Sequence, residues 1–496
     1  MSAASWVGVD LGTQSVRAVA VAHDGVVMST AAQPLHSIRT GGRHEQHPGE
    51  WIAATAAALR AVTAALPNGV GPLGVSVSGT SGTLVAVDAR TGAPRGVGVM
   101  YDDRRGAGLL PDVDDAGSEV WSRLGYRMQA SWGLPTLMQM LRESPLEQNT
   151  VIAHQPDVIT SMLAGRLLPS DLSSALKTGV DLDEIAWPET VFSALGIPVD
   201  VVNNVVASGM VIGEVGPVAS SATGLPQGCL IVSGMTDGCA AQIASGALHP
   251  GDWNSVLGTT LVVKGSAGVR HVDPTGAVYA HRAPFGGGWY PGGASSSGAG
   301  VMTKLLPGRD LGKLTERFNP TAPPPIAYAL VGRGERFPFV APDATGFLPS
   351  GDDDELFSAI LYGVAYVERL GYDLLRWVGY DIGGKVFVTG GGAKNSAWNQ
   401  LRADMLGRDI SPAVHGEGAV GMAMLAAASL EHRNDPRTGD PLVAVAKRMV
   451  PEVKPVGPTA SREAALSEGY ATFVAHLFDR GWIPAGLRDA AMSGVK

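Results

Sequence analysis

Cysteine and charge are both scarce in this chain of 496 residues. The two cysteines, Cys229 and Cys239, are too few for a disulfide framework or a four-cysteine zinc site. We expect both thiols to be small buried groups in a reducing compartment. Charged residues make up only 17% of the chain, and the net charge of -9 argues against a basic nucleic-acid-binding surface. No nucleic-acid partner is therefore expected.

Long apolar segments are also missing. The most apolar late run, GAVGMAMLAAASL at 418–430, is too short for a membrane span, which needs about 20 residues. The first residues, MSAASW, have neither a basic stretch nor a long apolar stretch, so no signal peptide is predicted. We therefore expect a cytoplasmic protein that does not enter a membrane.

The sequence does contain an alternation of strands and helices. A chain of this length, with 45% apolar residues, is expected to form at least two domains. The Ala-rich segment 48–66 predicts a helix that starts at a proline. Strands are predicted at 7–10, 16–22, 26–29, 73–79 and 83–88. This order indicates an α/β fold with mixed sheets.

The tripeptide Leu-Gly-Thr occurs once in each half of the chain, at 11–13 and at 257–259. Each copy lies at a turn between two apolar strands. A three-residue match is weak alone, but its repetition in the same context indicates two related α/β domains. We place these domains at 1–246 and 247–496.

Three glycine-containing turns are candidates for binding phosphate. The chain has no Gly-x-x-x-x-Gly-Lys-Ser/Thr run, and its glycine cluster at 390–392 does not complete a dinucleotide fingerprint. Backbone N–H groups in the turns 12–15, 258–260 and 390–395 can still hold an anion. Each turn alone can be an ordinary turn, but all three together favour a nucleotide held between two lobes.

Two aspartates follow predicted strands. Asp237 lies between a strand at 230–233 and a helix, where α/β sheets present catalytic groups. It is either a helix cap or a general base that accepts a proton from a hydroxyl. Asp10 either begins a hairpin turn or belongs to a phosphate and metal site.

Other polar segments have a structural and a functional interpretation. Thr80, Ser81 and Thr83 form either a polar hairpin or a set of donors and acceptors for a polyhydroxylated ligand. The segment 101–105, YDDRR, is either a solvated charge run or part of the same site. His44 and His47 have no third ligand at a useful spacing, so zinc is not expected there.

Together, nine motifs resemble the FGGY family of carbohydrate kinases in the actin/hexokinase/chaperone superfamily. They are VGVDLGTQSVRAVAV, HEQHPGEW, VSVSGTSGTLVAVD, YDDRR, GMTDG, LGTTLVV, GERFPF, GGGAKNSAWNQLRADMLG and EGAVGMAMLAA. They follow the family order over almost the whole chain. The resemblance implies two actin-like (ribonuclease H-like) domains with mixed sheets and a cleft between them. It also implies ATP and Mg²⁺ as cofactors and a small sugar as substrate. We expect a monomer or homodimer.

The resemblance also implies roles for individual residues. Asp237 matches the catalytic base at the substrate, and Asp10 matches the carboxylate near the sugar hydroxyl and the metal. Thr80 and Ser81 are expected at the sugar. The residues expected at the nucleotide are Thr13, Gln14, Ser15 and Arg17 in the first hairpin, Gly258, Thr259 and Thr260 in the second, and Gly293, Gly391, Gly392 and Asn395.

Within the family, the chain departs from the commonest xylulokinase pattern. Thr80-Ser81-Gly82 stands where many xylulokinases have Gln-Met-His, and Met138 and Leu141 stand where Lys-x-x-Trp is usual. The segments GTSGT, SDLSSALKTGVDLD, GGASSSG and GERFP resemble the D-ribulose kinases of cyanobacteria and plants. We therefore expect phosphorylation of the terminal hydroxyl of D-ribulose. D-xylulose or another sugar or polyol is the alternative within the family, and an actin- or chaperone-type ATPase without a small acceptor is the alternative outside it.

Overall fold

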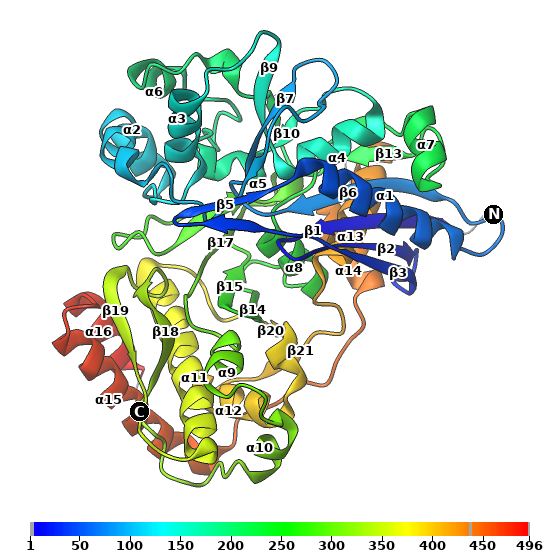
Figure 1. Ribbon diagram of the computed structural model, residues 1–496. Coiled ribbons are helices and arrows are strands. Elements are labelled where there is room, and N and C mark those ends of the chain that lie inside the picture. The colour runs from blue at the N-terminus through cyan, green and yellow to red at the C-terminus, as the bar shows by residue number, and fades with distance from the viewer. Residues whose placement is uncertain (1–3, 436–438, 495–496) are drawn as a thin grey trace. The chain divides into compact units, whose positions relative to one another are not determined.

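The computed structural model describes residues 4–435 and 439–494, and its contacts divide the chain into two compact units (Figure 1). The first unit contains residues 1–246, 281–288 and 417–451, and the second contains 247–280, 289–416 and 452–496. From sequence, a single division between residues 246 and 247 is expected. The structure instead also returns two later segments to the first unit, because a helix in the second of them packs on that unit's sheet.

The first unit is built on a six-stranded mixed sheet with the order β12-β13-β6-β1-β2-β3. Strand β1 is antiparallel to β2 and parallel to β6; β2 is antiparallel to β3, and β6 is parallel to β13. The strands are β1 (Ser5–Leu11), β2 (Ser15–Ala22), β3 (Val27–Pro34), β6 (Pro72–Gly79), β12 (Val211–Glu214) and β13 (Leu230–Val232). The apolar side chains of β1 are buried on both faces, which explains its nearly continuous apolar sequence.

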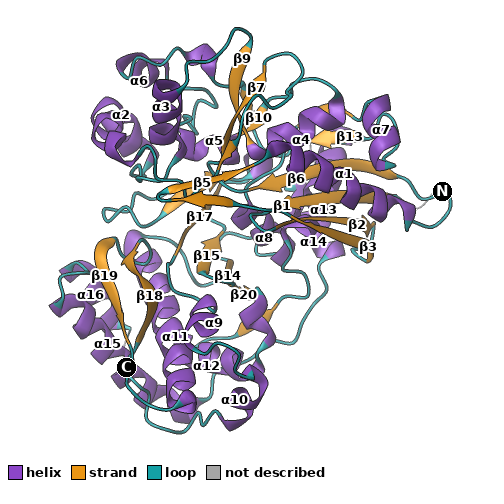
Figure 2. Cartoon of the chain, viewed as in Figure 1, coloured by secondary structure: helices purple, strands orange, loops and turns teal. Residues whose placement is uncertain are grey.

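The second unit repeats this arrangement. Its sheet has the order β16-β17-β15-β14-β20-β21. Strand β14 is antiparallel to β15, β15 is antiparallel to β17, and β14, β20 and β21 run parallel. The strands are β14 (Trp253–Leu257), β15 (Leu261–Gly265), β16 (Tyr279–Arg282), β17 (Trp289–Ala294), β20 (Val386–Thr389) and β21 (Ile410–Pro412). The series β17-β15-β14-β20-β21 thus matches β3-β2-β1-β6-β13, which confirms two related α/β domains with mixed sheets (Figure 2).

Helices cover both faces of the first sheet. Helix α1 (Pro48–Ala64) contacts β2 and β3, and α13 (Gly418–Asn434) contacts β1, β6 and the neighbouring α8 (Asp237–Ser245). Helix α13 approaches β1 closely at Gly8, where a Cβ atom would lie 1.7 Å from the carbonyl oxygen of Ala419. The missing side chain therefore lets a helix from late in the chain lie directly on the first strand (orange on blue in Figure 1).

A smaller five-stranded sheet, with the order β4-β5-β8-β7-β9, also belongs to the first unit. Its strands are β4 (Ile38–Thr40), β5 (Arg43–Gln46), β7 (Leu84–Asp88), β8 (Gly98–Val99) and β9 (Thr150–His154). The chain leaves the large sheet at the end of β6 and enters this sheet at β7. Residues 80–83 therefore connect two sheets, and the polar hairpin considered from sequence is not formed.

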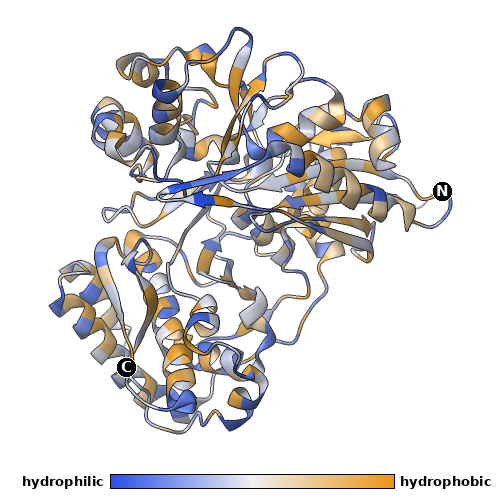
Figure 3. Ribbon diagram, in the orientation of Figure 1, coloured by the Kyte–Doolittle hydropathy of each residue, from blue (hydrophilic) through white to orange (hydrophobic). Residues whose placement is uncertain are grey.

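The core of the second unit surrounds α11 (Asp353–Val378), a long helix rich in apolar residues (Figure 3). Its start is capped by the Asp352 carboxylate, which accepts hydrogen bonds from two backbone N–H groups, as the acidic run 352–354 indicates. The Pro-rich segment 319–327 leads into β18 (Tyr328–Glu335), which pairs with β19 (Ala341–Phe347). The first three residues of β18 are buried.

Shorter elements complete both units. They are α2 (Leu110–Leu124), α3 (Gly133–Glu143), α4 (Gln155–Ala164), β10 (Ser170–Asp171), α5 (Leu172–Ala175), α6 (Glu189–Ala194), β11 (Val205–Val206), α7 (Pro217–Thr223), α9 (Gly300–Leu305), α10 (Leu311–Arg317), α12 (Ser396–Leu406), α14 (Pro441–Met449), α15 (Glu463–Asp479) and α16 (Ala485–Ser493). Within the described residues, no helix is long and apolar enough to cross a membrane.

Candidate active site

Asp10 lies near the end of β1, between two strands that supply its neighbours. In the strand register it lies beside Arg17 of β2 and Ser78 of β6, and the Ser78 hydroxyl donates a hydrogen bond to its carboxylate (2.7 Å). Burial raises the pKa of Asp10 to about 6, and the negative charges of Asp237 and Glu417 act in the same direction. The hydrogen bond from Ser78 and the charge of Arg17 thus do not offset the effect of burial on the Asp10 carboxylate.

Asp237 is the first residue of α8, and its side chain is exposed. The preceding residue, Thr236, forms a parallel bridge with Gly79 at the end of β6, so Asp237 and Thr80 follow neighbouring backbone positions. The N-terminal end of α8 carries partial positive charge, which favours an ionised carboxylate at this position. Asp237 and Asp10 therefore meet at the carboxyl edge of one sheet, where α/β enzymes place their chemistry.

A buried hydrogen-bond chain holds the start of α8. The Thr236 N–H group donates to the Ser173 hydroxyl (3.2 Å), and this hydroxyl also bonds to Nδ1 of His281 (2.9 Å). Ser173 and His281 are both buried within the first unit. Sequence reasoning missed this support, because nothing local connects a histidine in a strand near residue 280 with the helix at residue 237.

Arg17 forms an ion pair with Glu417, the residue before α13 (2.7 Å). Both side chains are substantially exposed, at 41% and 50%, so the pair contributes little to stability and can exchange partners. Glu417 was missed as a site residue, although it opens the motif EGAVGMAMLAA. Gly418 follows, and a Cβ atom there would lie 3.1 Å from the Asp10 carboxyl carbon.

The carbonyl groups of the first Gly-Thr turn accept hydrogen bonds from other parts of the protein. The Gly12 N–H group donates to the Ser15 carbonyl (3.1 Å), which closes the turn. The Gln14 carbonyl accepts from the Leu35 N–H group (2.8 Å), and the Thr13 carbonyl accepts from Nε2 of Gln46 (2.7 Å). Within the described chain, the N–H groups of Thr13 and Gln14 have no protein acceptor. A turn with bound carbonyls and free N–H groups is suited to hold an anion.

The carbonyl groups of the second Gly-Thr turn, in the second unit, are also hydrogen-bonded, here only by backbone N–H groups. The Gly258 N–H group donates to the Thr260 carbonyl (3.1 Å). The Gly258 and Thr259 carbonyls accept from the N–H groups of Ala299 (2.9 Å) and Gly300 (3.1 Å). A Cβ atom at Gly300 would lie 2.9 Å from the Thr259 carbonyl oxygen, so the close approach requires glycine. The repeated tripeptide therefore marks equivalent turns in the two units.

The four nucleotide residues predicted late in the chain all lie in the second unit, and one of them packs on Leu257. A Cβ atom at Gly392 would lie 2.5 Å from the Leu257 side chain, whereas at Gly391 it would meet nothing within 4 Å. Asn395 caps α12, since its side-chain oxygen accepts from the Trp398 N–H group (3.0 Å). Gly293 lies in β17, where a Cβ atom would lie 2.3 Å from Phe337. Packing and capping thus account for three of these four positions, and their contact with nucleotide stays a prediction.

The two hydroxyl residues after β6 differ in availability. The Thr80 hydroxyl is bonded to Gln155 Oε1 (2.7 Å) and to the Thr83 hydroxyl (2.6 Å). The Ser81 hydroxyl is buried and has no hydrogen-bond partner among the described residues. The Ser81 hydroxyl can therefore still form hydrogen bonds, whereas the Thr80 hydroxyl is already bonded within the protein.

The donor set around Asp10 fits a divalent cation that arrives with a phosphate ligand. Among the described residues, no group of three or more His, Cys, Asp or Glu side chains could hold a metal ion alone. Mg²⁺ commonly binds through one or two carboxylates together with substrate phosphates and water. The raised pKa of Asp10 indicates that added positive charge would stabilise its ionised form.

Two related α/β domains, each with a Gly-Thr turn at the same place in its sheet, have the two-domain fold of the actin-like kinases. Residues 5–244 match the N-terminal domain model of the FGGY family of carbohydrate kinases, and residues 255–430 match its C-terminal domain model. The chain belongs to the FGGY family of carbohydrate kinases. It is an ATP-dependent sugar kinase, and kinases of this family generally use a divalent metal with ATP.

Known relatives resemble the chain over nearly its whole length. A xylulose kinase of Streptomyces coelicolor is 28% identical over 92% of this chain and 93% of its own length. A xylulose kinase of Bacillus subtilis is 23% identical over 85% and 87%, respectively. The solved xylulose kinase of Lactobacillus acidophilus has the same fold, with a TM-score of 0.84, 17% identity, and coverage of 96% of this chain and 98% of that one.

Proposed function

We propose that this kinase phosphorylates the terminal hydroxyl of D-ribulose and forms D-ribulose 5-phosphate. The observation that carries the proposal is the placement of an exposed Asp237 beside Asp10 and Thr80 at one edge of the first sheet. This arrangement places a carboxylate that can accept a proton next to a polar segment that can bind the hydroxyl groups of a sugar. A nucleotide-binding protein without a small acceptor has no need for it.

In the proposed reaction, Asp237 accepts the proton of the terminal hydroxyl while that oxygen attacks the γ-phosphorus of ATP. The bond from this phosphorus to the bridging oxygen breaks, and ADP leaves. The hydrogen-bond chain through Ser173 and His281 fixes the start of α8 and hence the position of the base. Since phosphoryl transfer depends mostly on positioning and charge stabilisation, a rigid helix start is functionally useful.

The two Gly-Thr turns supply the phosphate contacts in this proposal. The free N–H groups of Thr13 and Gln14 bind phosphate oxygens, as do the N–H groups of Thr259 and Thr260 in the second turn. Ser15 and Arg17 belong to the same phosphate-binding segment, and Arg17 can exchange Glu417 for a phosphate. Asp10 would hold Mg²⁺ together with the ATP phosphates, directly or through water, and the metal would supply positive charge to the transferring group.

Ser81 is the group that we propose to select the sugar. Its buried, unpartnered hydroxyl can bond a sugar hydroxyl, and a buried polar group that stays unpaired with the wrong substrate lowers its affinity. Together with the resemblance of the Thr80-Ser81-Gly82 segment to D-ribulose kinases, this favours D-ribulose. D-Xylulose is the second candidate, because several relatives that match most of the chain are xylulose kinases.

A substrate panel tests the proposal. The purified protein is incubated with Mg²⁺, ATP and D-ribulose, D-xylulose, L-ribulose, glycerol or D-gluconate, and ADP release is measured. We expect the highest kcat/KM with D-ribulose. A higher value with D-xylulose would replace the first candidate by the second, and ATP hydrolysis that no sugar stimulates would contradict both.

Replacing Asp237 tests the proposed base. We expect Asp237→Asn to lower kcat at least about 100-fold, because the proton acceptor is lost, while nucleotide affinity changes little. Asp112→Asn is the matched control, since Asp112 is an exposed aspartate in the first turn of α2 in the same unit. Nearly unchanged turnover in Asp237→Asn would remove Asp237 from the mechanism.

We also propose that the enzyme works in the cytoplasm as a monomer or homodimer. Its two cysteines are buried thiols, which is compatible with a reducing compartment. Size-exclusion chromatography with light scattering would establish the number of subunits, and a trimer or larger assembly would contradict this part of the proposal.

A further inference from the structure

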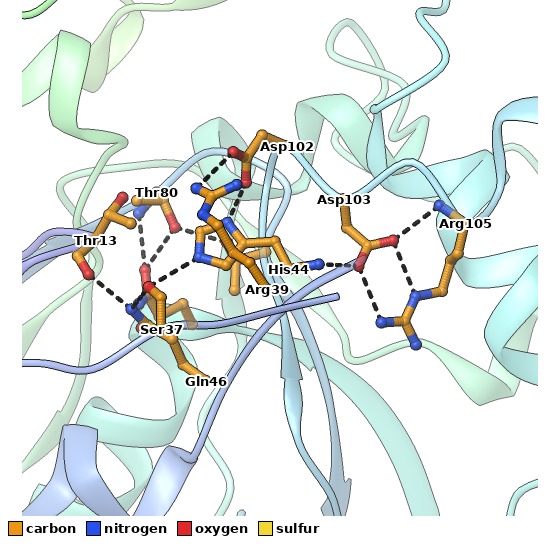
Figure 4. A network of polar contacts seen from close by, with 11 residues as sticks. Thr13, Ser37, Arg39, His44, Gln46, Thr80, Asp102, Asp103 and Arg105 are labelled. Atoms are coloured by element: carbon orange, nitrogen blue, oxygen red, sulfur yellow. Dashed lines mark hydrogen bonds and ion pairs between the residues drawn. The ribbon is translucent and has the colours of Figure 1, made fainter. Parts of the chain in front are cut away.

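Gln46, at the end of β5, donates a side-chain hydrogen bond to the Thr13 carbonyl within the first unit (Figure 4). The corresponding carbonyls of the second Gly-Thr turn are held by backbone N–H groups. The first turn therefore depends on a side chain where the second depends on the backbone. This difference makes the bond accessible to mutagenesis.

The orientation of the Gln46 amide is determined by its three partners. Nε2 donates to the Thr13 carbonyl (2.7 Å) and to the Ser37 hydroxyl (3.0 Å), and Oε1 accepts from Nε1 of Trp51 (2.7 Å). A flipped amide would place its oxygen against the Thr13 carbonyl and its N–H groups against the indole N–H. Only one orientation satisfies all three contacts.

A chain of polar side chains continues behind Ser37. The Ser37 hydroxyl lies 2.9 Å from Nε2 of His44, and Nδ1 of the same ring bonds to the Asp102 carboxylate. Arg39 donates to the other oxygen of Asp102 (3.0 Å). When Nδ1–H donates to the carboxylate, Nε2 accepts from Ser37, and the Ser37 oxygen is left to accept from Gln46. All donors in the chain then point consistently.

The neighbouring Asp103 holds the backbone of the hairpin that β4 and β5 form. Its carboxylate accepts from the His44 N–H group (2.7 Å) and is bonded to the Arg105 guanidinium through two nitrogens (2.9 Å each). Arg105 also donates to Glu45 (2.5 Å). Asp103 and Arg105, in the segment 101–105, thereby hold the strand that carries Gln46. The charged run YDDRR thus has a structural role, because it stabilises the strand whose glutamine bonds to the first Gly-Thr turn.

We infer that Gln46 is a positioning residue for phosphoryl transfer, which holds the Thr13 carbonyl so that the N–H groups of Thr13 and Gln14 face the ATP phosphates. This inference rests on the proposed role of the turn in phosphate binding. A peptide group has its N–H and C=O groups on opposite sides, so fixing the Thr13 carbonyl also fixes the direction of the Gln14 N–H group.

The test is Gln46→Glu, which keeps the shape of the side chain and the bond from Trp51 but places a carboxylate oxygen against the Thr13 carbonyl. We expect the Kd for the Mg²⁺ complex of AMP-PNP, a non-hydrolysable ATP analogue, to rise at least about tenfold by titration calorimetry. The kcat/KM for ATP should fall by a similar factor. The Kd for D-ribulose should stay within twofold of the wild-type value.

Asn203→Asp is the matched control. The Asn203 amide also donates to a backbone carbonyl, that of Leu168 (2.8 Å), and to a serine hydroxyl, that of Ser170 (3.2 Å), in the same unit. This variant makes the same chemical change away from the turn, so it should lower thermal stability but leave both ligand affinities within twofold. Equal weakening of AMP-PNP binding in the two variants, or no weakening in Gln46→Glu, would overturn the inference.

Ser37→Ala provides a second test if Gln46→Glu does not fold. It removes one partner of Gln46 and keeps the bond to Thr13, so we expect AMP-PNP affinity to fall two- to fivefold with no change for sugar. Unchanged AMP-PNP affinity would contradict the inference. If the wild-type protein binds AMP-PNP but phosphorylates no sugar of the panel, the proposed function fails, while the binding comparison still decides the role of Gln46.

Discussion

Asp10 should make the stability of the first unit depend on pH. Burial, and the nearby negative charges of Asp237 and Glu417, raise the pKa of its carboxyl group from 3.8 to about 6. The folded state therefore binds the Asp10 proton more tightly than the unfolded state does. This contribution to stability is complete below the unfolded-state pKa and is lost as the pH rises through 6.

The size of the effect follows from the difference between the two pKa values. It corresponds to about 3 kcal/mol of lost stability once Asp10 is ionised in both states, and about half of this loss is already present at pH 5. Because the side chain retains some contact with water, 3 kcal/mol is an upper value. Asparagine has nearly the same shape and carries no charge, and its side-chain oxygen can still accept from Ser78.

We expect Asp10→Asn to unfold at a higher urea concentration than the wild type at pH 8, by the equivalent of about 2–3 kcal/mol. This gain should shrink toward zero as the pH falls to 4. The measurement is urea unfolding of the metal-free and nucleotide-free protein between pH 4 and 8, and the free energy is taken from the unfolding transition of the first unit. Asp171, whose pKa is also raised to about 6 by burial, is unchanged in both proteins and cancels in the difference.

Asp24→Asn is the control, because Asp24 is an exposed aspartate in the turn between β2 and β3 of the same unit. It should follow the wild-type pH dependence. Parallel stability curves for the wild type and Asp10→Asn, or a less stable Asp10→Asn at pH 8, would refute the reasoning. Sugar kinase activity should fall in Asp10→Asn, so the variant would gain stability at the expense of function.

Two further predictions concern the cores of the units. Gly8→Ala should cost more than about 3 kcal/mol or prevent folding, because its Cβ atom would overlap the Ala419 carbonyl of α13; Gly49→Ala, with open space in α1, should be neutral or stabilising when melting temperatures are compared. Arg402→Met should cost about 3–5 kcal/mol in urea unfolding, since Glu368 would stay buried without its partner. Adding Glu368→Leu should recover part of that loss, and no recovery would contradict this explanation.

Local features of the fold are readable from the sequence because they depend on neighbouring residues. The apolar strands around the two Leu-Gly-Thr tripeptides form β1 with β2 and β14 with β15. The Pro-initiated, Ala-rich segment forms α1. The position of Asp237 after a strand and at the start of a helix is likewise set locally. The hydrophobic period changes there from that of a strand to that of a helix, so the junction can be located from the sequence. The family motifs also lie within short segments, so the kinase class follows from them.

Side-chain partners that are far apart in sequence were less predictable. A polar hairpin was one of two interpretations of the hydroxyls at 80–83, but the chain crosses there between two sheets. Nothing in the periodicity of HEQHPGEW shows that Gln46 reaches the Thr13 carbonyl. These contacts depend on which sheet edge each strand joins, and strand propensity does not specify a strand's partner.

The sequence by itself determined the repeated turns, the α/β class, the family and the two aspartates that we assign to the chemistry. Only the tertiary structure decided which distant groups surround them. In the tertiary structure, Glu417 and Gly418 lie near Asp10, and His281 lies near the start of α8. The physical reason is that burial of an apolar helix face against β1 brings α13 into the first unit. An apolar face specifies that burial occurs, whereas close packing at a few positions such as Gly8 specifies where.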